Sequence, residues 1–317
     1  MTLSLPLSND ELHHRGPPLT WDNTMRGQLL QCPRKLYFFL CGYDYVSKPA
    51  YFTFGSAYHE FLRIWHESGS NLGKLPLALD AALLLWDTDA PFAFGDNTRE
   101  NLIRLCNAYA TFYPKEPWHV IPGGGEVGWI YPLPACSFLE RAYNLGGSMD
   151  ARIEWPGYGV LIREDKSEGG WLSRGFLDSF IFSPQVTGYI WYDSQLQGST
   201  TFGALVNMAS KKVAKAGQTP RFTRSLQQRS PKELDDFILG FQFDLLRFEF
   251  FWKSWVWPRT CDSGNCVGGK GKSVCLFKEV CKGTRDMPLE KIDPLSFENV
   301  GHRENLWEPW KREGEQE

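Results

Sequence analysis

The stretch GGSMDARIEWPGYGVLIREDKSE, residues 146–168, decides the predicted fold. It reads as two strands joined by a tight Pro-Gly turn at residues 156–157. The second strand runs through the apolar residues 160–162 and then ends in the tripeptide Glu-Asp-Lys, residues 164–166. Charged side chains at the end of an apolar strand are costly to bury unless they pair with each other or bind a metal.

The register of this hairpin determines which charges meet. If the turn is centred on Gly157, residues whose numbers sum to 314 are opposed, and Asp150 faces Glu164. Opposed Cβ atoms lie about 5 Å apart, where two carboxylates repel unless one is protonated or a cation lies between them. Alternation puts Glu164 and Lys166 on one face and Asp165 on the other. A turn centred one residue away would break the pairing, and a surface ion pair between Glu164 and Lys166 is the alternative.

Two carboxylates beside an ammonium suit metal-assisted phosphodiester hydrolysis. Carboxylate oxygens are ligands for Mg²⁺ and Mn²⁺. A bound metal lowers the pKa of a water and offsets charge on the scissile phosphate. Lys166 would orient the attacking water and stabilise charge in the transition state.

The composition is that of a folded globule, with 42% hydrophobic residues, 13 Trp and 22 Phe in 317 residues. No apolar run approaches the roughly 18 residues that span a bilayer, and residues 1–18 show no signal-peptide pattern. We therefore expect a cytoplasmic protein without a membrane partner.

The net charge of −3 argues against an obvious nucleic-acid binder, but it hides a local bias. Residues 194–232 contain no acid, and aromatic residues interleave with the positive ones. This pattern suits a surface over a phosphate backbone, with an ordinary solvated basic face as the alternative. The candidate nucleic-acid-binding residues are Lys211, Lys212, Lys215, Arg221, Arg224 and Arg229.

Hydrophobic periodicity predicts a helical block followed by a sheet. Residues 1–20 are predicted to be a loose arm, and residues 285–317 a lightly structured polar tail. The predicted helices cover residues 23–42, 55–68, 76–88, 97–113, 183–196 and 232–256. The predicted strands begin near residue 126 and include the hairpin, residues 201–210 and residues 221–226.

The hairpin resembles the motif of the PD-(D/E)XK nuclease superfamily, with Asp150 as the first acid and residues 164–166 as the E-x-K. More narrowly, the chain resembles the RecB/AddB-like nucleases that carry an iron–sulfur cluster, a group that includes CRISPR adaptation nucleases and many phage proteins. GSAYHEFL resembles the helix whose His, here His59, is a metal ligand. SPQVTGYIWY resembles the Q-x-x-x-Y helix, with Gln185 and Tyr189.

The resemblance implies a role for each matched residue. His59, Asp150 and Glu164 would bind Mg²⁺ or Mn²⁺, aided by the backbone carbonyl of Asp165. The catalytic set would be Asp150, Glu164, Lys166, Gln185 and Tyr189, of which Lys166 acts on the water and the last two support the site or the DNA. Glu126 occupies a place where some relatives have an acid, and we assign it no role. The chain has E-x-K where Asp-Tyr-Lys is more usual, which the chemistry tolerates because either acid can bind a metal.

The cysteines extend the resemblance. Four of the eight lie within residues 261–281, a density typical of metal ligands, and a cytosolic chain is not expected to form disulfides. QCPRKLYFF resembles the segment whose Cys, here Cys32, is the distant cluster ligand, and the Cys275-x5-Cys281 spacing matches the end of the cluster motif. The commonest pattern would place another Cys at position 272, where this chain has Lys272.

Four thiolates hold either a [4Fe-4S] cluster or zinc. The absence of local C-x2-C pairs favours the cluster over zinc. The candidate ligands are Cys32, Cys266, Cys275 and Cys281, with Cys261 as the alternative to Cys266.

The sequence thus predicts an α/β protein with a PD-(D/E)XK restriction-endonuclease-like core, a mixed sheet flanked by helices, a helical N-terminal elaboration and an iron–sulfur clasp. One nuclease domain is expected over residues 21–284, divided into a helical part (20–113), a catalytic sheet (114–230) and a long helix with the cysteine cluster (231–284).

The expected activity is metal-dependent DNA cleavage, with an exonuclease acting on single strands or ends favoured. The alternative is a catalytically silent DNA-binding or assembly protein that keeps the nuclease fold. The chain has no Walker A pattern, so any helicase would be a separate partner.

Overall fold

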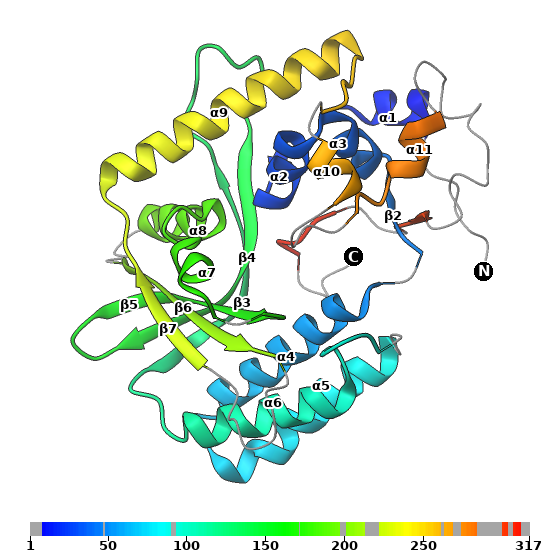
Figure 1. Ribbon diagram of the computed structural model, residues 1–317. Helices are drawn as coiled ribbons and strands as arrows, with labels where there is room; N and C mark the ends of the chain where they lie inside the picture. Colours follow the sequence, from blue (N-terminus) through cyan, green and yellow to red (C-terminus); the bar gives the residue numbers. More distant parts are fainter. Residues whose placement is uncertain are drawn as a thin grey trace. The chain divides into compact units, whose positions relative to one another are not determined.

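The computed structural model describes residues 8–46, 48–89, 93–170, 172–196, 201–212, 222–260, 263–268, 274–283, 300–303 and 307–311. The protein is α/β, with a mixed sheet flanked by helices (Figure 1). The chain forms two compact units that alternate along the sequence. Of the described residues, the first contains those within 8–46, 130–146 and 238–311, and the second contains those within 48–129 and 147–237. The expected continuous domain over 21–284 is therefore divided, and its helical part is split after residue 47.

The sheet is six-stranded, in the order β1-β4-β5-β6-β7, with β3 also paired to β4. Its bounds are β1 Thr20–Trp21, β3 His119–Pro132, β4 Asn144–Trp155, β5 Gly159–Glu168, β6 Thr201–Ser210 and β7 Phe222–Gln227. The β4–β5 and β6–β7 pairs are antiparallel, whereas β5 and β6 run parallel. Strand β5, the second strand of the hairpin at residues 146–168, therefore has a hydrogen-bonded strand on each side.

The β4–β5 register confirms the predicted centring of the turn. The pairs run from Trp155 opposite Gly159 to Ala151 opposite Arg163, and their numbers sum to 314. Gly157 and Gly159 have φ values of 88° and 82°, a left-handed backbone that favours glycine. Asp150 and Glu164 come next along the two strands, so the hairpin carries the two acids to one end.

The helices of the second unit are α4 (Ala50–Glu67), η1 (Leu72–Lys74), α5 (Leu75–Asp89), α6 (Arg99–Phe112), α7 (Arg174–Asp178) and α8 (Pro184–Gln195). Buried side chains of α4, α5 and α6 form one core cluster, in which Phe61, Trp65, Leu105 and Tyr109 are fully buried. This packing fixes α4, the helix that carries His59.

The first unit contains α1 (Asn9–Arg15), α2 (Asn23–Gln31), α3 (Pro33–Leu40), β2 (Tyr43–Tyr45), most of α9 (Pro231–Ser254), α10 (Ser263–Val267), α11 (Lys278–Gly283) and β8 (Val300–His302). The prediction of a loose arm over residues 1–20 is wrong for α1, because Ser8 and Glu11 form a reciprocal capping box at its start.

The helix predicted over residues 23–42 is interrupted at Cys32. Cys32 has an extended backbone, ends α2 and precedes α3, whose first residue is Pro33. Proline suits the first position of a helix because it lacks an N–H, and it disfavours helical geometry in the residue before it.

Part of the predicted polar tail is ordered in this unit. β8 pairs antiparallel with β2, and the Arg303 guanidinium lies 4.0 Å from the centre of the Phe39 ring. The Trp307 indole donates a hydrogen bond of 3.0 Å to Asp22, the residue that caps α2.

Within the described ranges, no helix combines the length and the apolar character needed to cross a membrane.

Candidate active site and cysteine-lined cavity

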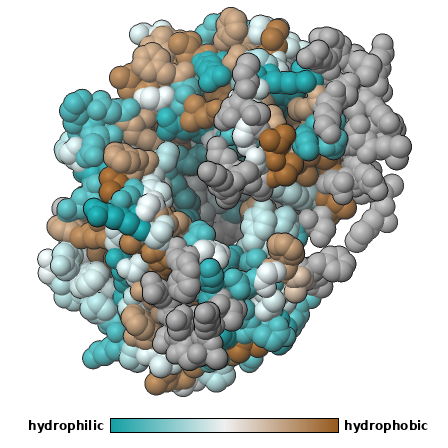
Figure 2. All heavy atoms as spheres, viewed as in Figure 1, coloured by the Kyte–Doolittle hydropathy of each residue, from teal (hydrophilic) through white to brown (hydrophobic). Residues whose placement is uncertain are grey.

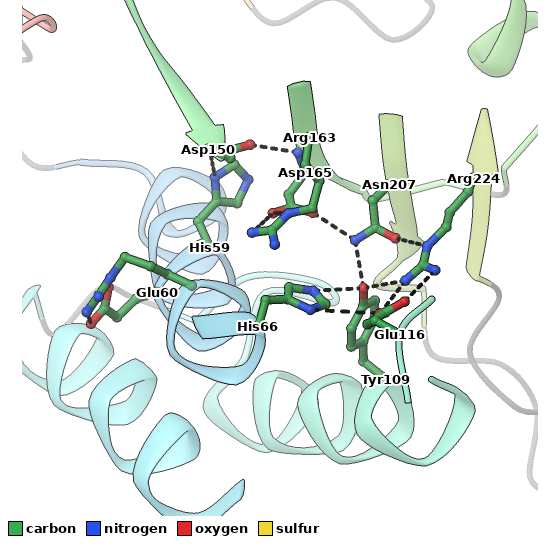
Figure 3. A network of polar contacts seen from close by, with 11 residues as sticks. His59, Glu60, His66, Tyr109, Glu116, Asp150, Arg163, Asp165, Asn207 and Arg224 are labelled. Atoms are coloured by element: carbon green, nitrogen blue, oxygen red, sulfur yellow. Dashed lines mark hydrogen bonds and ion pairs between the residues drawn. The ribbon is translucent and has the colours of Figure 1, made fainter. Parts of the chain in front are cut away.

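Five of the predicted site residues converge from three elements. His59 of α4 places its Nδ1 3.0 Å from Oδ1 of Asp150 in β4, and the backbone N–H of Asp165 in β5 donates to Oδ2 of Asp150 at 2.6 Å (Figure 3). The Lys166 ammonium contacts Oε1 of Glu164. Each carboxylate is thus held by a basic side chain.

Burial and neighbouring charges set the protonation of these groups. Burial raises the pKa of Glu164 and the Asp150 charge raises it further, with Lys166 opposing both. Burial opposes ionisation of Asp150, yet the charge and hydrogen bond of His59 hold the pKa of Asp150 well below its usual range. The pKa of His59 rises to about 9, because Asp150 outweighs the effect of burial. Of these two carboxylates, Glu164 is therefore the one whose charged form is stabilised less by the neighbouring residues.

The donor set fits a divalent cation chemically. Two carboxylates and an imidazole are suitable ligands, and a cation beside Glu164 would favour its charged form. In the geometry observed, the carboxylates face His59 and Lys166 instead, and no group of three or more His, Cys, Asp or Glu in the described part of the chain is arranged to hold a metal ion. A bound cation would replace some of these contacts.

Behind the site, the side chain of Asp165 points to the opposite face of β5, as alternation predicts. Asp165 and Arg163 are each 1% exposed, and Nε and Nη2 of Arg163 lie 3.0 and 2.9 Å from Oδ2 of Asp165. The Asn207 amide donates to Oδ1 of Asp165 at 2.7 Å. The Asp165 carboxylate is therefore a structural acceptor, and the role expected of this residue concerned its backbone.

The network continues into α6 and β7, as Figure 3 shows. Asn207 and Arg224 donate to the Tyr109 hydroxyl at 2.9 and 3.1 Å, and Nε2 of His66 lies 3.1 Å from the same oxygen. Arg224 also makes two hydrogen bonds to the Glu116 carboxylate, of 2.7 and 2.5 Å. We name these residues the rear network: His66, Tyr109, Glu116, Arg163, Asp165, Asn207 and Arg224.

Sequence reasoning missed this network as a unit. One signal was present, because Asn207 is polar within the otherwise apolar run of residues 202–209 in β6 and is only 2% exposed. A buried amide needs hydrogen-bond partners, so such a residue points to an internal polar cluster.

The predicted basic surface differs from the structure at several positions. Arg224 is a member of the rear network, so its guanidinium serves an internal ion pair. Lys211 is 6% exposed and its ammonium lies 5.0 Å from the centre of the Phe54 ring. Arg229 donates to Thr187 and to the Phe180 carbonyl, both at 2.9 Å.

The remaining basic candidates are Lys212, Lys215 and Arg221. Lys212 is half-buried, and Lys215 and Arg221 lie outside the described residues. Lys211, Arg224 and Arg229 therefore do not form a continuous basic face, because their charged groups contact other residues of the protein.

Gln185 and Tyr189 form a pair along α8. The Gln185 amide donates to the Tyr189 hydroxyl at 2.7 Å, and this hydroxyl donates to the Ser148 carbonyl at 2.5 Å. Ser148 precedes Asp150 by two residues in β4. The pair thus anchors the strand that carries the first acid.

Glu126 lies near the same group of charges. It has a φ of 41°, unusual for a residue other than glycine. Burial raises the pKa of Glu126, with Glu60 and Asp150 adding to the effect and Arg63 opposing it.

The first unit contains a cavity of about 220 Å³ on which all four favoured cluster ligands meet. Its lining includes Cys32, Cys266, Cys275 and Cys281. The Cys275 N–H donates to the Cys266 carbonyl at 3.1 Å, and the Thr260 N–H donates to the Cys32 sulfur at 3.4 Å. Residues separated by up to 249 positions, 32 and 281, are thereby gathered around one space. Cys261, the alternative ligand, lies outside the described residues.

The chemistry of this cavity fits a group bound by thiolates. Burial raises the pKa of Cys281 to about 11, with Arg259 and Arg34 opposing it, and burial also raises the pKa of Cys275, with Lys35 opposing. A positive ion would favour the thiolate forms, and these basic side chains would offset the excess negative charge of four thiolates. Cys41, Cys106 and Cys136 are free thiols that do not line this cavity.

The chain was compared with protein-family models, curated proteins and solved structures. No protein-family model and no curated protein matches it. A solved structure titled "Crystal structure of SSO0001" is 10% identical, with a TM-score of 0.32, over 75% of this chain and 82% of that chain.

Proposed function

We propose that this protein is a divalent-metal-dependent DNA nuclease with a PD-(D/E)XK core, an exonuclease acting on single strands or DNA ends. The observation that carries the proposal is the meeting of His59 with Asp150 and of Glu164 with Lys166 at one end of the β4–β5 hairpin. A mixed sheet with this hairpin at its centre supports the same core.

The proposed metal ligands are His59, Asp150 and Glu164, with the backbone carbonyl of Asp165. Bound Mg²⁺ or Mn²⁺ would lower the pKa of a water and offset negative charge on the scissile phosphate. Lys166 holds its proton, because Glu164 and Asp150 raise the pKa of Lys166 against the effect of burial. Its ammonium can therefore orient a water and stabilise the charge that develops on phosphate oxygens.

The protein's own contacts would keep this geometry preorganised. The Asp165 N–H and the His59 ring fix the two oxygens of Asp150. Gln185 and Tyr189 hold β4 two residues earlier. Enzymes depend on such support because small displacements of reacting groups lower rates strongly.

The second part of the proposal is a structural [4Fe-4S] cluster in the cavity of the first unit, with zinc as the less favoured occupant. Cys32, Cys266, Cys275 and Cys281 would hold it. Thiolate ligands suit both groups. The cluster would join α2 and α3 to the segments around α10 and α11.

The test of the nuclease activity uses anaerobically purified full-length protein. Cleavage of end-labelled single- and double-stranded DNA, with RNA as a further substrate, is measured with Mg²⁺, Mn²⁺ or EDTA. We expect cutting that needs metal and that falls at least about 100-fold in Lys166→Ala. Lys232→Ala is the matched control, since its side chain is 82% exposed in a pair with Asp236.

The outcome separates the two functions considered for this fold. Equal cutting by Lys166→Ala and wild type would contradict the assigned role. Tight DNA binding without any cutting would favour the silent binding or assembly protein.

The cluster is tested by metal and sulfide analysis of the same preparation. We expect about four irons with matching sulfide per chain. Cys266→Ser should lose this iron, whereas Cys136→Ser should keep it, because Cys136 does not line the cavity. Zinc without iron in anaerobic protein would instead support the zinc occupant.

A further inference from the structure

Helix α9 is apolar on two opposite sides. One side is buried in the protein through Phe241, Leu245 and Phe248, all 0% exposed. The other side carries four large apolar residues that are well exposed: Leu239 (46%), Phe243 (53%), Leu246 (37%) and Phe250 (66%). Their spacing of four, three and four places them in one line along the helix. We name them the α9 stripe.

A helix at a protein surface normally has one apolar face, and one that is apolar all round is normally covered on all sides. Single exposed apolar residues are common, but a contiguous row of four marks an interaction surface. Figure 2 shows apolar residues gathered along the upper edge of the view, where α9 runs in Figure 1. The Phe138 ring stacks on Phe243 at 5.0 Å between centroids and widens the patch.

We propose that the α9 stripe pairs two copies of this chain, with their α9 helices antiparallel. A two-fold axis between residues 244 and 245 opposes residues whose numbers sum to 489. It sets Leu239 against Phe250 and Phe243 against Leu246, so that each large ring meets a smaller side chain in all four contacts. Closed dimers use the same patch on both copies, and this row is complementary to itself under that operation.

Charges on the same face favour this orientation. The axis also opposes Asp236 of one copy and Lys253 of the other, whereas a parallel pair would place like charges together. Among the described residues of one chain, these groups make exposed ion pairs, Lys232 with Asp236 and Lys253 with Glu140. Exposed pairs contribute little, so exchanging them across a dimer costs little.

The size of the stripe sets the expected strength. Four partly exposed side chains cover a few hundred Å², less than the roughly 800 Å² per partner of a standard stable interface. The dimer is therefore weak and dependent on concentration. The proposal is independent of the nuclease assignment, since α9 carries none of the proposed catalytic residues.

The first test is sedimentation velocity of the full-length protein between about 1 and 200 µM, a range that covers micromolar dissociation constants. The weight-average mass should rise towards twice the monomer value, and Phe250→Asp should weaken association at least about tenfold. Phe182→Asp is the control, because Phe182 is 85% exposed and lies outside α9. A chain that stays monomeric throughout, or a dimer that Phe250→Asp leaves intact, overturns the proposal.

The second test exchanges charges and leaves the apolar residues unchanged. Asp236→Lys and Lys253→Asp should each weaken the dimer, and the double variant should restore it. A double variant weaker than either single one overturns the antiparallel pairing. Circular dichroism verifies that each variant is folded, and DNA cleavage per chain is expected to match wild type in all of them.

Discussion

The two faces of β5 neutralise their charges in different ways. On the rear face each cation has an acid of the same protein beside it, Arg163 with Asp165 and Arg224 with Glu116. On the opposite face, burial and the nearby charge of Asp150 both raise the pKa of Glu164. The contact with Lys166 opposes this rise but does not cancel it.

This difference separates charged side chains that stabilise the fold from charged side chains that are available to a ligand. In the rear network each carboxylate is paired with a guanidinium, and the two pairs are linked through Asn207 and Tyr109. The front face retains a buried acid whose charged form would gain from a further cation. Mutations on the two faces should therefore affect different properties.

The largest effect is expected on the front face. Glu164→Gln should lower cleavage by about 10³-fold or more, since it removes a proposed metal ligand. It should not lower the melting temperature without metal, because burial already disfavours the charge that it removes. The rise in melting temperature on adding Mn²⁺ should disappear. Wild-type cleavage by this variant would show that the front face is not the metal site.

On the rear face, Arg224→Ala should cost about 3 kcal/mol of unfolding free energy, because it leaves the Glu116 carboxylate buried and unpaired. Urea unfolding measures this. DNA affinity of the folded variant should stay near wild type, in contrast to the role first expected for Arg224. Arg174→Ala is the control, as Arg174 is 94% exposed. An affinity loss in the folded Arg224 variant would return this residue to the DNA interface.

Tyr109→Phe sharpens the comparison within the rear network. It removes the oxygen that accepts from Asn207 and Arg224, although both donors keep another acceptor. We expect a loss of about 1–2 kcal/mol, measured by the same urea unfolding. Tyr158→Phe, at a residue 45% exposed, should change little. A loss as large as that of Arg224→Ala would mean that the hydroxyl, not the ion pair, holds the network together.

The free energy of unfolding should depend on pH through His66, a member of the rear network. Burial, with the charges of Arg163 and Arg224, lowers the pKa of His66 well below its ordinary value of 6.5. The unfolded chain then binds a proton that the folded chain does not, so stability is lost as pH falls below about 6.5. Between pH 6.5 and 5.5, wild type should lose about 1 kcal/mol more than His66→Gln.

Urea unfolding at a series of pH values measures this difference, with His119→Gln as the control because His119 is 61% exposed. Parallel pH profiles for wild type and His66→Gln would show that His66 is not a buried neutral imidazole.

Local pattern sufficed for much of the fold. The hairpin register, the strand over residues 201–210 and the helix near residues 183–196 follow from alternation, turn residues and capping, and the structure has them at those places. The break at Cys32 was also encoded locally in Pro33, but the apolar periodicity on both sides of it predicted one continuous helix. The described end of the tail could not be predicted as part of a sheet, because β8 gains its partner from residues more than 250 positions earlier.

The sequence by itself determined which side chains share a face of β5, since alternation along a strand is a property of the backbone. It also supplied the four cysteines that line one cavity, as residue types with metal-ligand chemistry. Only the tertiary structure decided which charged side chains contact other residues of the protein rather than solvent. Whether Arg224 meets solvent or Glu116, and whether Lys211 is exposed or packed on Phe54, depends on elements that pack together from distant parts of the chain. A charge run in one dimension carries no information on burial, and burial sets whether a charge is available to a ligand or required by the fold.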